Sequence, residues 1–481
     1  MKKSWFNIDT VRAFYLSNYY PIFISLLVLV GSITGFEYYL NILNTALMVA
    51  SLFLVKSPRP FVFSLCTYIY QLSIKNAPEG YPYEPHLISS GYYFSGWRIY
   101  ISVAVVASIF IGVIYYFIKH GIYKKLSFKK TPMLAAVIAF SSALMLNGVF
   151  GEGWTMQNLL FGFANAFVYS FLFVFLYYAF EEEGTAELAK YIAYISMLMA
   201  LVISGELIHL FLTSETVFVD GSINKVGVAL GWGIWNLIAV SLAVLIPMLF
   251  YGMMHNRYPW LYFGTATLAY VMSVLTMSRN ALIFSTLTYG VCVIISCFVG
   301  KNKRVFRVIV ACGVVAVSLG SVLLWDKISA LLSDYIERGF SDNGRYALWS
   351  AAFENFLKAP VFGNGFYSFN VDTAVFGPLP KMAHNTVLEL LSATGVVGLF
   401  AYGYYRVKTL LPALVRPNIM KTMLAMSVLV LAFESLLDNF VFNIYPVFYY
   451  TLVIVALQKA KVEERDANLF RKFDVIFCVS S

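Results

Sequence analysis

Charged side chains are scarce in this sequence. Only 12% of its 481 residues are Asp, Glu, Lys or Arg, whereas a soluble domain carries about a quarter. Hydrophobic residues make up 60% of the chain, and the mean hydropathy is +0.74. This composition excludes an ordinary soluble protein and indicates a chain that is largely embedded in a membrane.

A disulfide framework and a cysteine metal site are also lacking. The five cysteines lie in apolar segments or in the tail, and none lies in a long polar loop: Cys66, Cys292, Cys297, Cys312 and Cys478. Their spacing matches no metal-ligand pattern. The sequence also shows no acidic metal-binding motif and no internal repeat. We therefore expect neither a metal nor a cofactor.

Long apolar runs make up most of the chain. A helix needs about 20 residues to cross the hydrocarbon core. Because lipid offers no hydrogen-bond partners, the backbone N–H and C=O groups of a spanning segment must bond to one another within the helix. The runs do not alternate between apolar and polar residues, so they do not indicate a membrane barrel. The prediction is an all-α, polytopic integral membrane protein with about 12–14 transmembrane helices. The fourteen segments are 21–36, 38–55, 60–74, 98–118, 132–150, 158–180, 191–212, 232–252, 259–278, 280–299, 308–324, 386–405, 422–438 and 446–458.

Lysine and arginine indicate the orientation of these segments. With the N-terminus in the cytoplasm, 25 of the 34 basic residues fall in cytoplasmic segments and nine fall outside. This is the positive-inside pattern, and it also explains the net charge of +9 without nucleic acid as a partner. The long polar loop at 325–384 is then extracytoplasmic. The tight turn that carries Arg279 lies on the same side of the membrane.

The predicted organisation has four parts. N-terminal transmembrane helices occupy 1–258, and a core at 259–405 contains the outer loop 325–385. C-terminal transmembrane helices follow at 406–458, and a cytoplasmic tail occupies 459–481. The outer loop carries an amphipathic helix, because Arg345, Trp349, Ala352, Phe353 and Phe356 recur at helical spacing. Pro360 is expected to end this helix. The alternative is a plain surface helix whose arginine reaches lipid phosphates.

A histidine stands where the outer loop enters the next apolar segment. Thr386 and Glu389 form a capping-box pattern that opens this segment. His384 is thus predicted at the water interface, where a neutral imidazole can act as a general base. The alternative is a structural polar residue. Gly395 and Gly398 provide a small-residue face for helix packing.

Other ionisable residues have open roles. Arg279 suits a phosphate, because a guanidinium forms a planar fork of donors. Glu206, with His209 one turn later, and Glu434 lie within predicted spans, and intramembrane ionisable groups are functional candidates. Asp438 extends the acidic patch of Glu434 outward. Nothing in the sequence connects these acids to the outer loop.

At these residues the chain resembles the O-antigen ligase and polymerase family of bacterial membrane glycosyltransferases. The family's ligase-type pattern is His, then Asn, Ser or Gln, nine residues, Gly, two residues, and Gly, Thr or Tyr. His384-Asn385, Gly395 and Gly398 satisfy every position of this pattern. The resemblance extends over residues 260–405, and the span number agrees less well, because many ligases are assigned twelve spans.

The resemblance implies a metal-independent transfer of a glycan from undecaprenyl diphosphate to an acceptor hydroxyl. The acceptor is a glycan or lipid-linked glycan, and the reaction takes place at the outer face of the bacterial cytoplasmic membrane, among its lipids. Arg279 and Arg345 would hold the diphosphate, His384 would activate or orient the acceptor, and Asn385 would also contact substrate. Ligase and polymerase are not distinguished. The rival is a transporter or flippase of lipid-linked glycans, which needs no long outer loop ending in histidine.

Overall fold

The computed structural model describes residues 7–68, 96–125, 133–219, 222–300, 303–323, 344–371, 380–442 and 446–461, with a few single residues between these ranges. The chain forms two compact units, which are described separately. The N-terminal unit comprises Met1–Lys125, Ala179–Glu182 and Lys190–Lys301. The C-terminal unit comprises Leu126–Tyr178, Glu183–Ala189 and Asn302–Ser481.

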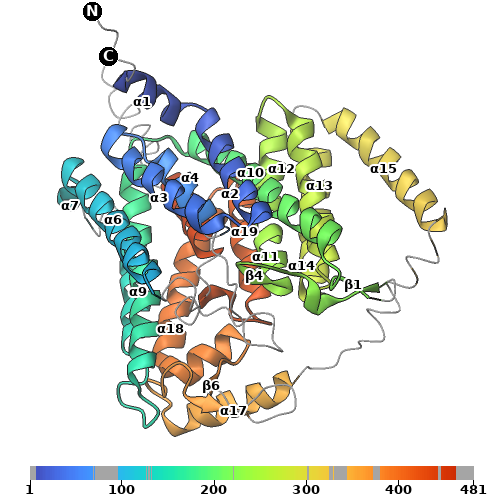
Figure 1. The fold of residues 1–481 in the computed structure, drawn as a ribbon. Helices are drawn as coiled ribbons and strands as arrows, with labels where there is room; N and C mark the ends of the chain where they lie inside the picture. Colours follow the sequence, from blue (N-terminus) through green and yellow to red (C-terminus); the bar gives the residue numbers. More distant parts are fainter. Residues whose placement is uncertain are drawn as a thin grey trace, which may run out of the picture. The chain divides into compact units, whose positions relative to one another are not determined.

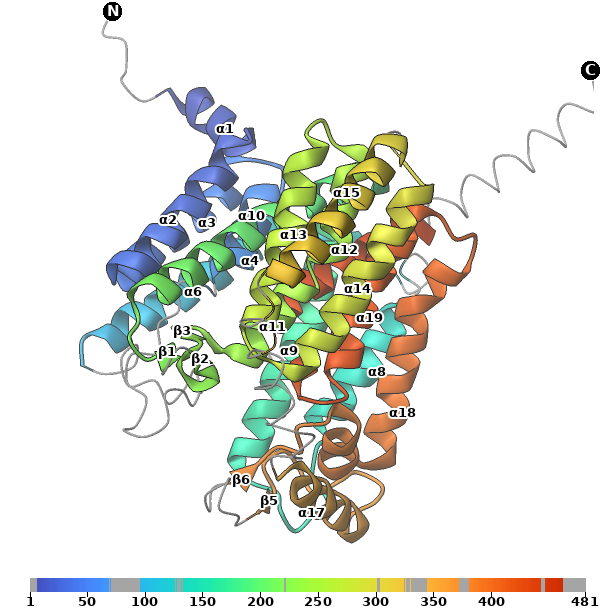
Figure 2. The same ribbon diagram turned by 90° about the vertical axis from the view of Figure 1, so that its right-hand side faces the viewer.

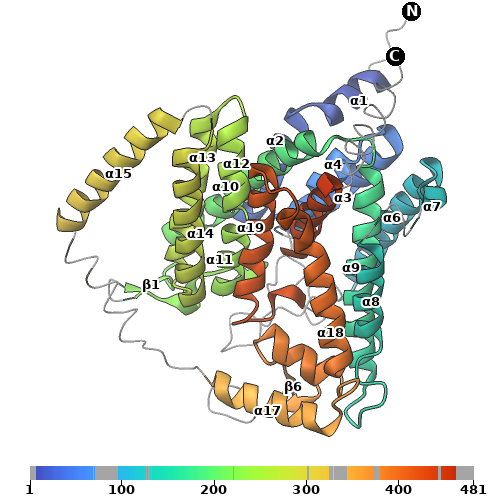
Figure 3. The same ribbon diagram turned by 180° about the vertical axis from the view of Figure 1, so that it is seen from behind.

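The N-terminal unit is built from helices of high apolar content. Helices α11, α12, α13 and α14 pack against one another, and they lie side by side in Figure 3. The helices are α1 (Ile8–Leu16), α2 (Tyr19–Thr34), α3 (Glu37–Leu54), α4 (Arg59–Tyr68), α6 (Arg98–Lys119), α7 (Ile122–Lys125), most of α10 (Thr185–Thr213), α11 (Trp235–Ala243), α12 (Ile246–His255), α13 (Pro259–Leu275) and α14 (Arg279–Phe298). Two short antiparallel pairs join β1 (Phe218–Val219) to β2 (Ser222–Ile223) and β3 (Ala229–Leu230) to β4 (Gly233–Ile234).

The C-terminal unit is organised around one long helix. It contains α8 (Leu134–Met145), α9 (Met156–Ala179, whose last residue belongs to the other unit), α15 (Lys303–Leu323), α17 (Arg345–Lys358), α18 (Thr386–Leu414), α19 (Ile419–Glu434) and a helix at 446–461. Helix α8 packs along α18, and α17 packs against the start of α18 (Figure 1). In Figure 2, α17 lies beside the antiparallel pair of β5 (Phe369–Asn370) and β6 (Pro380–Lys381).

Aromatic side chains form the core where α8, α9 and α18 meet. The ring of Phe140 lies 5.3 Å from that of Tyr169, 5.4 Å from that of Tyr402 and 5.3 Å from that of Tyr405, centroid to centroid. All four side chains are buried. Large rings bury much surface with few rotatable bonds. This cluster therefore fixes α18 against α8 and α9 at residues that follow the candidate site along the helix.

The helices fit a multi-pass membrane protein. Among the described residues, six helices are long and apolar enough to cross a membrane, or seven if α1 and α2, bent by 77°, form one span. Each of the fourteen predicted segments overlaps a helix. The predicted all-α polytopic class is therefore confirmed, and the number of spans stays a prediction. Beyond residue 461, the predicted tail lies outside the described residues.

Candidate functional site

Helix α17 carries the first of the candidate residues. It begins at Arg345, after Gly344 in the left-handed region at φ 77°, and it ends at Lys358, two residues before Pro360. Its buried residues are Leu348, Ala352 and Asn355. The predicted apolar face is confirmed in part: Ala352 is buried and Trp349 packs against the same cluster, but Phe353 is 48% exposed.

The physical reason for this difference is the partner of the helix. Leu348 and Ala352 form a buried cluster with Phe369, Val371 and Ala383 of the same loop. The buried face of α17 is the one that packs against its own loop and α18. An apolar residue on another face, such as Phe353, stays exposed.

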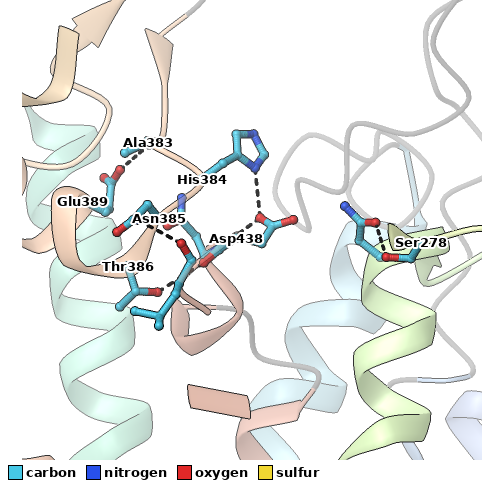
Figure 4. Close-up of polar contacts among 10 residues, drawn as sticks. Ser278, Ala383, His384, Asn385, Thr386, Glu389 and Asp438 are labelled. Atoms are coloured by element: carbon cyan, nitrogen blue, oxygen red, sulfur yellow. Dashed lines mark hydrogen bonds and ion pairs between the residues drawn. The ribbon is translucent and has the colours of Figure 1, made fainter. Parts of the chain in front are cut away.

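His384 sits in a strained and well-supported backbone position. Its φ is 47°, in the left-handed region that non-glycine residues seldom occupy. On one side, the buried carboxylate of Glu389 accepts the Ala383 N–H at 2.6 Å. On the other side, Asn385 is the N-cap of α18, and its side-chain oxygen accepts the N–H groups of Val387 and Leu388. The histidine is thus held between two fixed backbone anchors (Figure 4).

The predicted capping box is wrong in its register. The N-cap is Asn385, and Thr386 is the first helical residue. The Thr386 hydroxyl donates instead to the Asp438 carbonyl at 3.3 Å, and its N–H donates to the Ser435 carbonyl at 2.9 Å. An asparagine caps a helix as well as a threonine does, so the local sequence allowed both registers. Contacts with the segment after α19 select the observed one.

Asp438 is the direct partner of the histidine. Its Oδ1 lies 2.9 Å from Nδ1 of His384, and the two side chains are 15% and 41% exposed, respectively (Figure 4). Oδ1 also accepts the Asn439 N–H at 2.8 Å. A carboxylate only accepts, so Nδ1 carries the hydrogen of the neutral ring. The lone pair on Nε2 is then available for a proton from another molecule.

The electrostatics of this pair favour a charged histidine. Burial disfavours the imidazolium, but the Asp438 carboxylate outweighs it and raises the pKa of His384 above its ordinary value. Burial likewise disfavours the Asp438 carboxylate, but His384 prevails and lowers the pKa of that carboxyl. The Arg345 charge lowers the pKa of His384 and that of Asp438. Arg345 begins α17, and Leu348 of this helix packs with Ala383, the residue before the histidine.

Three of the four predicted site residues thus belong to one neighbourhood of the C-terminal unit. Arg345 acts electrostatically on His384, and Asn385 follows the histidine directly. The Asn385 amide hydrogen-bonds to backbone groups, with Nδ2 donating to the Leu436 carbonyl at 2.8 Å. These bonds give it a structural role, and its contact with substrate stays a prediction.

Arg279 is part of the N-terminal unit and begins α14. The preceding turn is ordered by its own hydrogen bonds, with Met277 at φ 58° and the Ser278 hydroxyl donating to Asn236 Oδ1 at 2.8 Å. The figure includes this contact (Figure 4). Arg279 is half-buried, and no acidic residue lies in the first turn of its helix.

The intramembrane acids differ in their surroundings. Glu206 is buried and accepts the indole N–H of Trp232 at 2.8 Å. Glu434, at the last position of α19, is buried, and within the described part of the chain its Oε1 has no hydrogen-bond partner. The acid that bonds to the histidine is neither of these two. The acid that sequence reasoning underrated is Asp438, which was grouped with Glu434 by spacing alone.

Comparison with known families supports the same region. Residues 263–403 match the family model described as O-Antigen ligase. No curated protein matches the chain. The matched residues include Arg279, Arg345, His384 and Asn385. The protein is thus a helical multi-pass membrane protein, and its residues 263–403 are similar to the O-antigen ligase family, in the region where the resemblance was predicted.

Proposed function

We propose that this protein transfers a glycan from undecaprenyl diphosphate to an acceptor hydroxyl at the outer face of the cytoplasmic membrane. The observation that carries this proposal is the His384–Asp438 pair, with a 2.9 Å contact and a partly exposed imidazole. A histidine oriented by a carboxylate is the arrangement that general-base catalysis of an attacking hydroxyl requires.

The transfer follows from this geometry in one displacement. The acceptor hydroxyl gives its proton to Nε2 of His384, and Asp438 stabilises the imidazolium that forms. The acceptor oxygen bonds to the anomeric carbon while the bond from that carbon to the diphosphate oxygen breaks. The leaving lipid diphosphate keeps the electron pair. Attack opposite the leaving group inverts the anomeric configuration.

Arg279 and Arg345 are assigned to the diphosphate in this proposal. Each is the first residue of a helix without a side-chain cap: the N-cap of α17 is Gly344, and the Ser278 side chain makes no capping hydrogen bond to α14. The positive end of a helix dipole favours an anion at this place. The helical N–H groups and the guanidinium together suit a phosphate oxygen whose charge grows as the bond breaks. Asn385 is assigned a contact with the acceptor only through its position beside the histidine.

The test is a transfer assay with purified, lipid-reconstituted protein. Undecaprenyl-diphosphate oligosaccharide is supplied alone or with lipid A–core, in EDTA, and both released undecaprenyl diphosphate and new glycan are measured. Extension of the oligosaccharide alone identifies a polymerase, and a product that needs lipid A–core identifies a ligase. His384→Ala and His384→Gln should lower the rate by about 10²–10⁴-fold.

The matched control is His255→Gln. His255 is an exposed histidine, and its Nδ1 lies 3.1 Å from the Tyr251 carbonyl of its own helix. It should retain full activity. Near-normal turnover by His384→Gln would reject the base assignment, and loss of wild-type activity in EDTA would reject metal independence. Glycan that changes sides of the membrane without a new glycosidic bond would instead identify the rival function, a flippase.

A further inference from the structure

Helix α18 is broken one third of the way along its length. Gly395 has φ 64° and ψ −162°, which no helical residue adopts, although helix continues on both sides. Such a break removes hydrogen bonds between successive turns, and buried backbone groups need other partners. In this chain the partners come from another part of the outer loop.

The segment 360–365, which follows α17, supplies these partners. Two of its N–H groups donate to carbonyls before the break, and two of its carbonyls accept N–H groups after it. The four bonds are Asn364 N to Ser392 O (2.8 Å), Gly365 N to Ala393 O (3.0 Å), Val396 N to Pro360 O (2.9 Å) and Val397 N to Val361 O (3.2 Å). We call segment 360–365 the staple, because it closes the break from the side.

Two buried asparagines connect the staple to both helices. Asn364, 3% exposed, lies in the staple and donates through Nδ2 to the backbone carbonyl of Asn355 at 2.8 Å. Asn355, 5% exposed, lies on α17 and donates to the Ser392 hydroxyl of α18 at 2.8 Å and to that of Ser368 at 2.7 Å. Buried amides with several partners each fix a position sharply, since an unpaired donor would be unfavourable.

The staple is also held from a third side. The Gly148 N–H donates to the Phe362 carbonyl of the staple at 3.2 Å, and the N–H of Phe366, the residue directly after the staple, donates to Asn147 Oδ1 at 3.3 Å. Both outside groups belong to the turn between α8 and α9. The staple is therefore fixed within the C-terminal unit before any ligand is present.

The two helices that the staple joins carry the two reactive side chains. Helix α17 begins with Arg345, and α18 begins directly after His384 and Asn385. We propose that Asn355 and Asn364 are positioning residues that hold α17 against the break in α18 and so fix the position of Arg345, at the start of α17, relative to His384. The inference rests on the proposed function for its catalytic meaning, and its structural content can be measured without substrate.

The measurement is the titration of His384 in the reconstituted full-length protein. Diethyl pyrocarbonate modifies the neutral imidazole, so labelling against pH, resolved by mass spectrometry, gives the midpoint for this histidine. The charged groups that act on it are Asp438 and Glu389, which favour the imidazolium, and Arg345, which disfavours it. A change that moves the Arg345 guanidinium away from His384 should therefore raise the labelling midpoint of this histidine.

Asn355→Ala and Asn364→Ala should each raise the midpoint by roughly half a pH unit, in the direction given by Arg345→Gln. Ser392→Ala, which removes only one acceptor of the Asn355 amide, should give a smaller rise and serves where an asparagine variant does not fold. The control is Asn165→Ala, whose amide donates only within α9, to the Phe161 carbonyl at 3.0 Å. It should leave the midpoint unchanged.

Transfer activity provides the second readout. The asparagine variants should lose about tenfold or more in kcat/KM, because a misplaced group of this kind impairs the reaction without abolishing binding. An unchanged His384 midpoint in all three staple variants would overturn the proposal. So would an unchanged midpoint in Arg345→Gln, because the guanidinium would then not act on the imidazole. Labelling needs no glycan donor. Either labelling result therefore tests the positioning proposal independently of whether the transfer assay supports the proposed function.

Discussion

At the scale of single residues, His384 combines a strained backbone with a paired side chain. A left-handed conformation in a non-glycine residue is unfavourable by about 1–2 kcal/mol. The Glu389 carboxylate and the Asn385 cap offset this strain on either side of the histidine. The result is an imidazole whose Nδ1 faces Asp438 and whose orientation does not depend on a bound substrate.

The pH dependence of transfer should report this pair. The neutral imidazole is the active form, so kcat/KM falls as the pH falls through the pKa of His384, which lies above its ordinary value of 6.5. Asp438→Asn removes the carboxylate that raises this pKa. The acid limb should then move to lower pH, while the plateau falls by about 10²–10⁴-fold because the tautomer is no longer fixed.

This experiment has an internal comparison. Glu434→Gln changes another buried acid, which ends α19 and is not the Nδ1 partner of His384, so the acid limb of this variant should stay near that of the wild type. An acid limb that does not move in Asp438→Asn would contradict the assignment of this carboxylate as the partner of the imidazole.

The two arginines should not tolerate lysine. Arg→Lys keeps the charge but loses the planar fork, and a charge-assisted hydrogen bond contributes about 1.5–3 kcal/mol. Arg279→Lys and Arg345→Lys should therefore each lower kcat/KM about 10- to 100-fold. Arg98→Lys is the matched control, because Arg98 also begins a helix and its guanidinium lies 5.6 Å from the Trp97 ring centroid. Wild-type kinetics in Arg345→Lys would remove this residue from the diphosphate site.

Residue-level prediction reaches side chains that stand in a local pattern and misses those whose partners are distant in sequence. Residue type and spacing single out His384 and Arg345, and their roles stay predictions. Asp438 lies 54 positions from His384, and no local pattern connects them. Asn355 and Asn364 have no local signal either, since their partners lie on other elements.

At the scale of elements, apolar length was predicted well and the faces of helices were not. Segments such as 158–180 and 386–405 correspond to α9 and α18 because long apolar helices need no tertiary information to be recognised. The buried face of α17 depends instead on which neighbour it meets. The N-cap at Asn385 was likewise chosen by contacts with the chain after α19.

The break in α18 makes Gly395 sensitive to substitution. A Cβ on Gly395 would collide with the Val361 carbonyl of the staple, and φ 64° already disfavours any side chain. Gly395→Ala should lower the free energy of unfolding by about 1–3 kcal/mol and impair transfer. Thermal unfolding of the purified protein and the transfer assay measure the two effects.

Gly403→Ala is the control within the same helix. A Cβ at Gly403 meets nothing within 4 Å, so this change should be neutral or stabilise the helix by up to about 1 kcal/mol. Equal stability of Gly395→Ala and Gly403→Ala would mean that the Val361 carbonyl of the staple does not lie close enough to Gly395 to exclude a Cβ.

At the scale of the whole molecule, the orientation of the helices in the membrane determines on which side of the membrane the proposed site would meet its lipid-linked glycan donor. In a cysteine-free background, Ser350→Cys on the exposed side of α17 should react with a membrane-impermeant maleimide in intact cells. Lys303→Cys, at the start of α15, should react only after the membrane is opened. The positive-inside distribution is the reason for this expectation. Labelling of Lys303→Cys in intact cells would reverse the topology and remove the proposed reaction from the outer face.

The pairing of distant segments also has a consequence for biosynthesis. His384 is synthesised 54 residues before Asp438, and the staple closes on a turn made more than 200 residues earlier, at Asn147. A nascent chain that has emerged as far as α18 therefore contains the histidine without its carboxylate. Its imidazole stays unassisted until α19 and the loop after it have been inserted. Chains that stall or are cleaved in this interval should therefore lack the proposed general base, which is complete only after Asp438 has been added.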